Sequence, residues 1–187
     1  VVVVSAMGDT TDDLINLAHT VTPAPDDREL ALLMSTGEIV SCTLLTMAIR
    51  SLGYNAISLS GGQAGIITKG EYNHARIMDI DPQRIIRELD DDNIVIVAGF
   101  QGTNDEMDIT TLGRGGSDTT AVALAAKLNA QVCQIYTDVE GIYTADPRIV
   151  PNARKISNIA YEEMLELASY GAKMPPRPKT PADPSVI

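Results

Sequence analysis

The chain has 187 residues, of which 44% are hydrophobic, 21% charged and 4% aromatic, and its formal net charge is -11. A chain of this length buries roughly 70% of its unfolded surface, which suffices for one ordinary hydrophobic core. The apolar content is too high for a disordered protein. The negative charge argues against a nucleic-acid partner, because Lys and Arg must neutralise phosphates. With two cysteines and no long apolar run, we expect a reducing, cytoplasmic setting and no membrane span.

The first quarter of the chain predicts one strand and two helices. Val1–Val4 is a continuous β-branched run, which is typical of a strand covered on both faces. A short helix capped by Thr10 or Thr11 follows it. The longest helical pattern runs over residues 26–52. Gly37 lies in the middle of that pattern, where it indicates either the close approach of another segment or a break between two helices.

The rest of the chain continues to alternate between strand and helix patterns. We expect a strand over 55–60, a hairpin over 66–79, a helix over 82–89, a strand over 94–98, a polar loop over 101–112, an Ala-rich helix capped by Ser117 or Asp118 and ending at Leu128, a strand over 132–136 and a helix over 161–172. The first strand and that over 94–98 are apolar throughout, and that over 132–136 is apolar except for Gln134. This pattern predicts an α/β fold: a three-layer αβα sandwich with a mainly parallel sheet.

Ligands of such sheets bind beyond the carboxyl ends of the strands. Each apolar strand here ends in small or polar residues, and the densest candidate site is Thr-Leu-Gly-Arg-Gly-Gly-Ser-Asp over residues 111–118. Glycines let backbone N–H groups approach a ligand, and the start of the following helix favours an anion. Arg114 could hold a carboxylate or phosphate with two bonds. The alternative is a tight surface loop with an Asp helix cap.

Weaker candidates lie elsewhere in the chain. After the strand over 132–136, Tyr143 could stack on a base and Arg148 could reach a phosphate, or the segment is an ordinary turn loop. Glu38 could bind a ligand's ammonium group, although a solvated helix Glu is the commoner case. His19 and His74 are isolated, which predicts structural or surface roles. No P-loop, dinucleotide fingerprint, hydrolase elbow or zinc-ligand pattern is present.

Several of these stretches resemble aspartokinases, in the same order and at similar spacing. They are Val-Ser-Ala-Met-Gly-Asp-Thr-Thr over 4–11, Met-Ser-Thr-Gly-Glu over 34–38, the glycine-rich stretch over 111–118, Thr137-Asp138 through Asp-Pro-Arg over 146–148, and Gly-Ala-Lys over 171–173. The resemblance implies the amino-acid kinase (carbamate kinase-like) fold over residues 1–173. It also implies transfer of the γ-phosphate of ATP, bound with Mg²⁺, to the side-chain carboxylate of L-aspartate. The product, 4-phospho-L-aspartate, leads towards lysine, threonine and methionine.

The resemblance assigns residues to each ligand. Arg114 and Asp118 would be catalytic, and no metal ligand is expected from the chain. L-Aspartate would be bound by Ser5, Thr10, Glu38, Arg114, Gly115, Gly116, Ser117 and Asp118. ATP would be bound by Thr137, Asp138, Gly141, Tyr143, Arg148 and Lys173. The full-length protein is expected to be a homo-oligomer.

The chain departs from the family pattern at both ends. Family members begin with a strand carrying Lys-Phe/Tyr-Gly-Gly-Thr-Ser, whereas Val1 starts at what resembles the second strand. We therefore expect a fragment with little or no activity of its own. Residues 174–187 form a Pro-rich divergent tail, and the regulatory domains are expected to be absent. Two alternatives stay open: a non-catalytic nucleotide- or amino-acid-binding remnant, and a related kinase acting on glutamate or acetylglutamate.

Overall fold

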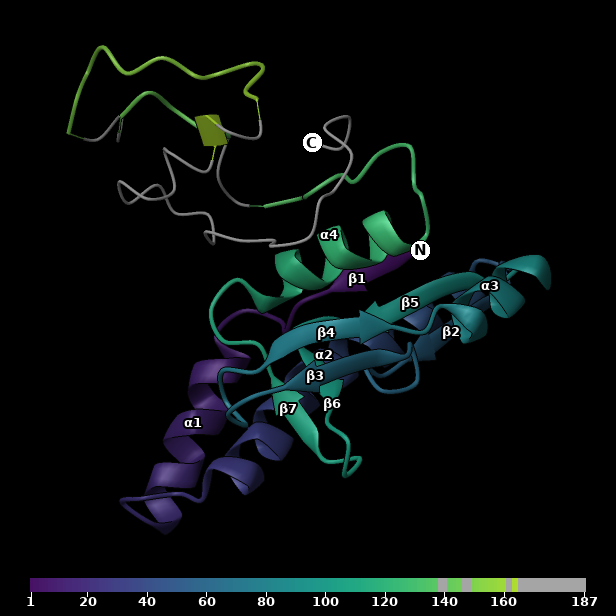
Figure 1. Cartoon of the computed structure of the whole chain (residues 1–187), viewed down its shortest axis with the longest axis vertical. Coiled ribbons are helices and arrows are strands. Elements are labelled where there is room, and N and C mark those ends of the chain that lie inside the picture. The colour runs from purple at the N-terminus through teal and green to yellow at the C-terminus, as the bar shows by residue number, and fades with distance from the viewer. Residues whose placement is uncertain (138–140, 146–148, 161–162, 165–187) are drawn as a thin grey trace. The chain divides into compact units, whose positions relative to one another are not determined.

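The computed structural model describes residues 1–137, 141–145, 149–160 and 163–164 (Figure 1). It divides into two compact units, residues 1–129 and 130–187, and each is described by itself. The described helices of the first unit are α1 (Thr10–Val21), α2 (Asp27–Ser51), α3 (Gln83–Asp90) and α4 (Gly116–Lys127). Its strands are β1 (Val2–Val4), β2 (Ala56–Leu59), β3 (Ile66–Lys69), β4 (Arg76–Ile80), β5 (Ile94–Ala98), β6 (Gln101–Thr103) and β7 (Ile109–Thr111).

The strands of the first unit form two sheets. One is parallel, with the order β1-β5-β2. The other has the order β4-β3-β6-β7, in which β3 runs antiparallel to β4 and parallel to β6, while β6 and β7 are antiparallel. In the parallel sheet Val4 lies opposite Ala98. The chain therefore leaves β1 and β5 at the same edge, where a ligand site is expected.

Helices cover both faces of the parallel sheet. Val95 and Val97 of β5 pack in one hydrophobic cluster with buried residues of α3 and α4. Ile96 and Ala98 pack in a second cluster with Cys42 of α2. Successive residues of a strand point to opposite faces, so these clusters form two cores with the sheet between them. The three-layer αβα sandwich expected from the sequence is confirmed (Figure 1).

The long helix α2 continues without a break through Gly37. A Cβ atom added to Gly37 would lie 3.0 Å from the Cβ of Ala6, so the glycine allows the chain after β1 to lie against the helix. The expected close approach is confirmed, and the alternative of two helices is wrong. Among the described helices α2 is long and apolar enough to cross a membrane. Core helices also pass that test, and α2 packs against the parallel sheet.

The predicted polar loop over residues 101–112 is wrong, because half of it forms the β6–β7 pair. Gln101, Thr110 and Thr111 are buried. The side chains of Gln101 and Thr110 have hydrogen-bond partners, which lowers the cost of burial, whereas the hydroxyl of Thr111 has none. Gln101 donates to the carbonyl of Ser35 at 2.9 Å. The hydroxyls of Thr68 and Thr110 share a 2.6 Å hydrogen bond between β3 and β7. A search for apolar alternation misses strands of this kind.

Both predicted helix caps are also wrong. Helix α1 begins at Thr10 itself, after Asp9, and no side chain caps it. Helix α4 begins at Gly116, after Gly115 in the left-handed conformation (φ 71°), again without a side-chain cap. The glycine turn, rather than a capping Ser or Asp, directs the chain into the helix.

Two apolar runs are less buried than predicted. β1 lies at an edge of its sheet, and Val2 is 39% exposed. Residues 132–136 form no strand, and Val132 and Tyr136 are 64% and 88% exposed. An apolar run becomes a buried strand only where a neighbouring strand accepts it, and the described part of the second unit offers only an isolated bridge between Tyr143 and Lys155. The predicted helix over 161–172 lies mostly outside the described residues.

Candidate amino-acid binding site

A cavity of about 580 Å³ lies where the chain leaves β1 and β5, within the first unit. Its walls come from helices α1 and α2, the turn that follows β1, the β3–β4 turn and Phe100. The glycine loop, which holds Gly113, Arg114 and Gly115 directly before α4, completes the lining. The volume is ordinary for a small-molecule site. Seven of the eight residues assigned to the amino acid line this cavity: Ser5, Glu38, Arg114, Gly115, Gly116, Ser117 and Asp118. Thr10 does not line it, and its hydroxyl donates to the carbonyl of Met7 at 2.6 Å.

The glycine loop brings the start of α4 close to the end of β5. A Cβ atom on Gly99 would lie 2.9 Å from the Cβ of Ser117, and one on Gly116 would lie 2.8 Å from the ring of Phe100. Side chains at these two positions would push the helix away from the sheet edge. The first N–H groups of an α-helix have no intrahelical partner, and no side chain caps those of α4. This end of the cavity therefore suits an anionic group.

Phe100 connects β5 to β6 in a strained conformation. Its φ is 68°, in the left-handed region that bulky residues rarely adopt. Its N–H donates to the hydroxyl of Thr120 at 3.1 Å, and its carbonyl accepts from the N–H of Leu112 at 2.8 Å. These bonds hold the strained residue in the cavity wall, and such strain is common at functional sites.

Glu38 provides a buried carboxylate in the cavity wall. Its side chain extends from α2, and the residue is 3% exposed. Oε1 accepts from the N–H of Ala6 at 3.2 Å, which the close approach at Gly37 makes possible. Oε2 is buried and has no hydrogen-bond partner. Burial raises the pKa of Glu38 to about 6, although the Ala6 N–H acts against this rise. An unpartnered buried carboxylate oxygen favours a cationic ligand group.

The cavity combines charges of both signs. Asp12, Glu38 and Asp118 are its carboxylates, and Arg114 is its only Lys or Arg among the described residues. Arg114 is exposed, and within the described part of the chain it forms no ion pair. The free guanidinium can hold a carboxylate with two hydrogen bonds. Together with Glu38, it suits a ligand that carries both an anionic and an ammonium group.

Sequence reasoning missed two lining residues on the β3–β4 turn, Asn73 and His74. His74 is exposed, as predicted, but it also faces the glycine loop. Two backbone hydrogen bonds connect the turn to β7: the N–H of Ala75 donates to Thr111 at 2.9 Å, and the N–H of Thr111 donates to Tyr72 at 2.7 Å. No local pattern shows such a long-range contact.

The residues assigned to ATP belong to the second unit. Thr137, Gly141 and Tyr143 are described, and the N–H of Ile156 donates to the carbonyl of Ile142 beside the Tyr143–Lys155 bridge. Asp138, Arg148 and Lys173 lie outside the described residues. Within the described ranges, no group of three or more His, Cys, Asp and Glu side chains could hold a metal ion.

The fold and the cavity define an α/β protein with a cavity at the carboxyl edge of a parallel sheet, lined by groups that suit a small charged ligand. Comparison with known families makes this class specific. The sequence model of the "Amino acid kinase family" matches residues 1–175. The chain therefore belongs to the amino acid kinase family.

Individual relatives in that family are named aspartokinases. The chain is 61% identical to the aspartokinase of Mycolicibacterium smegmatis over 175 residues, which cover 93% of this chain and 42% of that protein. It is 61% identical to the aspartokinase of Geobacillus stearothermophilus over 172 residues, covering 92% and 42% of the two chains. The chain thus spans less than half the length of these curated relatives.

Solved structures give the same result. The aspartate kinase from Synechocystis matches with a TM-score of 0.76 and 51% identity, covering 93% of this chain and 29% of that one. Aspartokinase III of E. coli, in complex with aspartate and ADP in its R-state, matches with a TM-score of 0.77 and 33% identity. That match covers 88% of this chain and 38% of the E. coli chain.

Proposed function

We propose that this chain is part of the catalytic domain of an aspartokinase, which transfers the γ-phosphoryl group of ATP to the side-chain carboxylate of L-aspartate. The observation that carries the proposal is that one cavity holds both the carboxylate of Glu38 and the guanidinium of Arg114. L-Aspartate presents an ammonium group and carboxylates, which match the unpartnered Oε2 of Glu38 and the unpaired guanidinium of Arg114. The aspartate bound in the E. coli relative supports the same choice of ligand.

The chemistry needs little from the protein beyond position and charge. The side-chain carboxylate of aspartate is already ionised at neutral pH, so no general base is required. One of its oxygens attacks the γ-phosphorus, the bond to the bridging oxygen breaks, and ADP leaves with the electron pair. The chain contributes by alignment and by balancing charge on the transferred group.

The cavity residues assigned to the amino acid have distinct roles in this scheme. Arg114 holds the α-carboxylate of aspartate, and Glu38 accepts hydrogen bonds from the ammonium group. The N-terminus of α4, with Gly115, Gly116 and Ser117, faces the anionic side of the ligand. Asp118 orients cationic groups near the phosphates. Ser5, after β1, completes the polar wall.

ATP and its metal ion are assigned on the resemblance. Thr137, Asp138, Gly141, Tyr143, Arg148 and Lys173 are the proposed ATP residues. Mg²⁺ would enter with ATP, and no residue of the chain is assigned to hold it. A homo-oligomeric full-length protein, without nucleic-acid or membrane partners, stays a prediction, as does the cytoplasmic setting.

The test places residues 1–175 of this chain into the M. smegmatis aspartokinase, in place of the matching segment. ATP-dependent formation of aspartyl hydroxamate is then measured with L-aspartate and with L-glutamate. The proposal predicts turnover with aspartate and at most trace turnover with glutamate. Turnover with glutamate instead would favour the related-kinase alternative. A folded chimera without turnover would contradict the proposal and favour a binding remnant.

A further inference from the structure

The proposed ligand presents one more carboxylate than Arg114 alone can pair with, in a cavity that is already acidic. L-Aspartate has two carboxylates and one ammonium group, while the cavity itself already holds the carboxylates of Asp12, Glu38 and Asp118. Among the described lining residues, the only group besides Arg114 that can carry a positive charge is His74. An imidazole N–H is also a good donor to a carboxylate when the ring is neutral.

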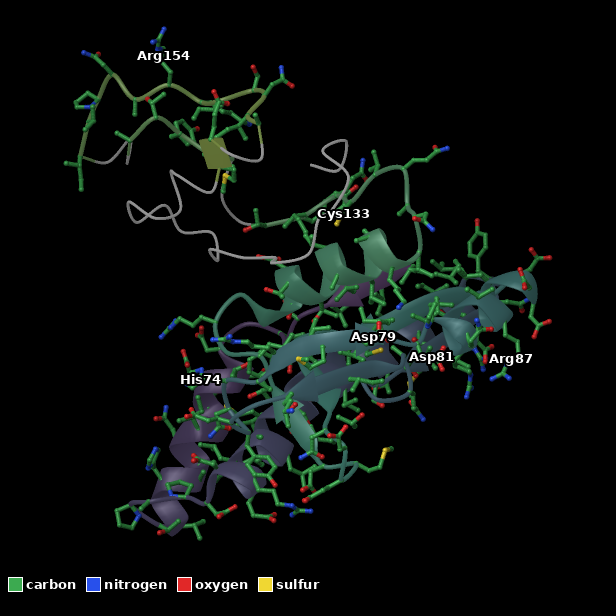
Figure 2. All side chains as sticks on the ribbon, in the orientation of Figure 1. His74, Asp79, Asp81, Arg87, Cys133 and Arg154 are labelled. Carbon is green, nitrogen blue, oxygen red and sulfur yellow. The ribbon has the colours of Figure 1, made fainter. Side chains whose placement is uncertain are left out.

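His74 lies directly against the glycine loop. Its Nδ1 would be 2.9 Å from a Cβ atom on Gly113, the residue before Arg114. Gly113 has a φ of 78° and lacks the side chain that would occupy this space. Figure 2 labels His74 in the first unit, close to the loop that leads into α4. The imidazole and the guanidinium therefore approach the cavity from adjacent positions.

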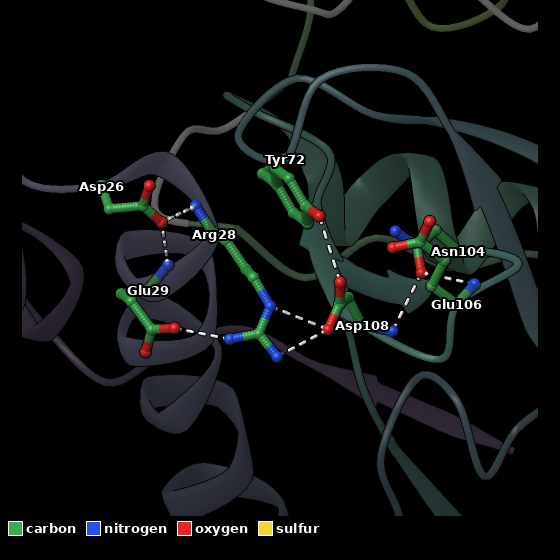
Figure 3. A network of polar contacts seen from close by, with 7 residues as sticks. All are labelled: Asp26, Arg28, Glu29, Tyr72, Asn104, Glu106 and Asp108. Atoms are coloured by element: carbon green, nitrogen blue, oxygen red, sulfur yellow. Dashed lines mark hydrogen bonds and ion pairs between the residues drawn. The ribbon is translucent and has the colours of Figure 1, made fainter.

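The turn that carries His74 is held firmly in place. Besides the backbone bonds to Thr111, the hydroxyl of Tyr72 donates to Asp108 at 3.0 Å. Asp108 also accepts from Nε and Nη2 of Arg28 at 2.9 and 2.7 Å (Figure 3). The side chain of Asn73 donates to Asp27 at 2.8 Å. Since Asp27 and Arg28 begin α2, these contacts fix the turn to the helix that carries Glu38.

These contacts leave the ring of His74 and the side-chain oxygen of Asn73 without hydrogen-bond partners among the described residues. No hydrogen bond within the described residues engages the ring of His74. The side-chain oxygen of Asn73 is buried and has no partner. Together with Oε2 of Glu38, it forms a second unpartnered acceptor among the lining residues. The turn thus offers polar atoms that are available to a ligand.

We propose that His74 is a substrate-binding residue, whose imidazole donates a hydrogen bond to the α-carboxylate of the amino acid alongside Arg114. The inference rests on the proposed function and extends it, because it gives the α-carboxylate two donors from two separate segments. The side-chain carboxylate then stays free to attack ATP. The proposal makes recognition of the amino acid depend on the β3–β4 turn as well as on the glycine loop.

The test compares His74→Ala, His74→Asn and His74→Gln in the chimera described above. Loss of a hydrogen bond to a charged group raises KM for aspartate about ten- to hundredfold in His74→Ala. kcat and KM for ATP change by no more than about twofold, because the contact is equal in ground and transition states. The amides of Asn and Gln keep a donor, so one of them should restore part of the affinity. His19→Asn on α1, outside the cavity lining, is the matched control and leaves every constant unchanged.

Two aspartate amides identify the carboxylate that His74 contacts. L-Asparagine keeps the α-carboxylate, and L-aspartic acid α-amide keeps only the side-chain carboxylate. Both are used as competitive inhibitors. The affinity for L-asparagine should fall in His74→Ala by the same factor as the affinity for aspartate, and the affinity for the α-amide should not change. Either of two results in His74→Ala overturns the inference while the proposed function stands. One is an unchanged KM for aspartate, and the other is a loss of inhibitor affinity that affects only the α-amide. A wild-type chimera that neither binds aspartate in calorimetry nor turns it over overturns both.

Discussion

Replacing Glu38 with Gln separates the stability of this protein from its proposed function. Burial raises the pKa of Glu38 from 4.5 to about 6. A carboxyl group with a raised pKa favours folding while it is protonated, and that contribution is lost as the pH rises through about 6. Each pKa unit corresponds to about 1.4 kcal/mol, so the ionised carboxylate costs the fold about 2 kcal/mol at pH 8. Gln keeps an oxygen for the Ala6 N–H and removes this cost.

We therefore expect Glu38→Gln to be more stable than the wild type at pH 8, by about 1–2 kcal/mol, and nearly equal at pH 4.5. The measurement is urea unfolding of the 187-residue chain at both pH values, followed by circular dichroism because the chain has no Trp. Glu106→Gln, an exposed residue on the β6–β7 loop, is the control and should show no such difference.

The same substitution should damage binding of the amino acid. The ammonium group loses its charged partner, so KM for aspartate rises by about thirtyfold or more. In the wild type, affinity for aspartate should fall as the pH drops below about 6, because protonated Glu38 no longer attracts the ammonium group. Equal stability of Glu38→Gln and wild type at pH 8, together with an unchanged KM, would refute the reasoning.

Three further predictions concern the cavity and the sheets. Arg114→Ala should raise KM for aspartate about 30- to several-thousandfold in the chimera. It should leave the urea midpoint of the chain unchanged, since Arg114 is exposed, and a retained KM would argue against the assignment. Gly99→Ala should lower the free energy of unfolding by about 1–3 kcal/mol, because its Cβ would lie 2.9 Å from that of Ser117; wild-type stability would contradict the close packing. Thr68→Val should cost about 1–3 kcal/mol by leaving the buried Thr110 hydroxyl unpaired, and Thr110→Val added to it should recover most of the loss. If the double variant is the less stable, the hydroxyl pair does not work as described.

The sequence predicted those features of the fold that depend on local periodicity. The parallel core around β5 follows from its continuous apolar run, and α2 follows from its helical period. The β6–β7 pair was missed because its buried residues are polar, and they bond to other elements: Gln101 to the carbonyl of Ser35 in α2, and Thr110 to Thr68 of β3. Residues 132–136 were misassigned for the converse reason, since an apolar run says nothing about whether a neighbouring strand is present.

The site shows the same division between local and long-range information. The glycine loop and Arg114 could be recognised as a candidate from the sequence alone, because glycines, a cation and a helix start are adjacent there. Gly37 predicted a close approach, and that approach places Glu38 beside the N–H of Ala6. Asn73 and His74 could not be found, because their place in the cavity depends on hydrogen bonds to Asp27, Asp108 and Thr111.

The most direct test of the central claim is a crystal structure of the chimera with L-aspartate. We expect the amino acid in the cavity between α2 and the glycine loop, with its α-carboxylate about 2.7–2.9 Å from the guanidinium of Arg114. The ammonium group should lie at hydrogen-bond distance from Oε2 of Glu38. Aspartate bound elsewhere, or a cavity that stays empty at saturating aspartate, would contradict that claim.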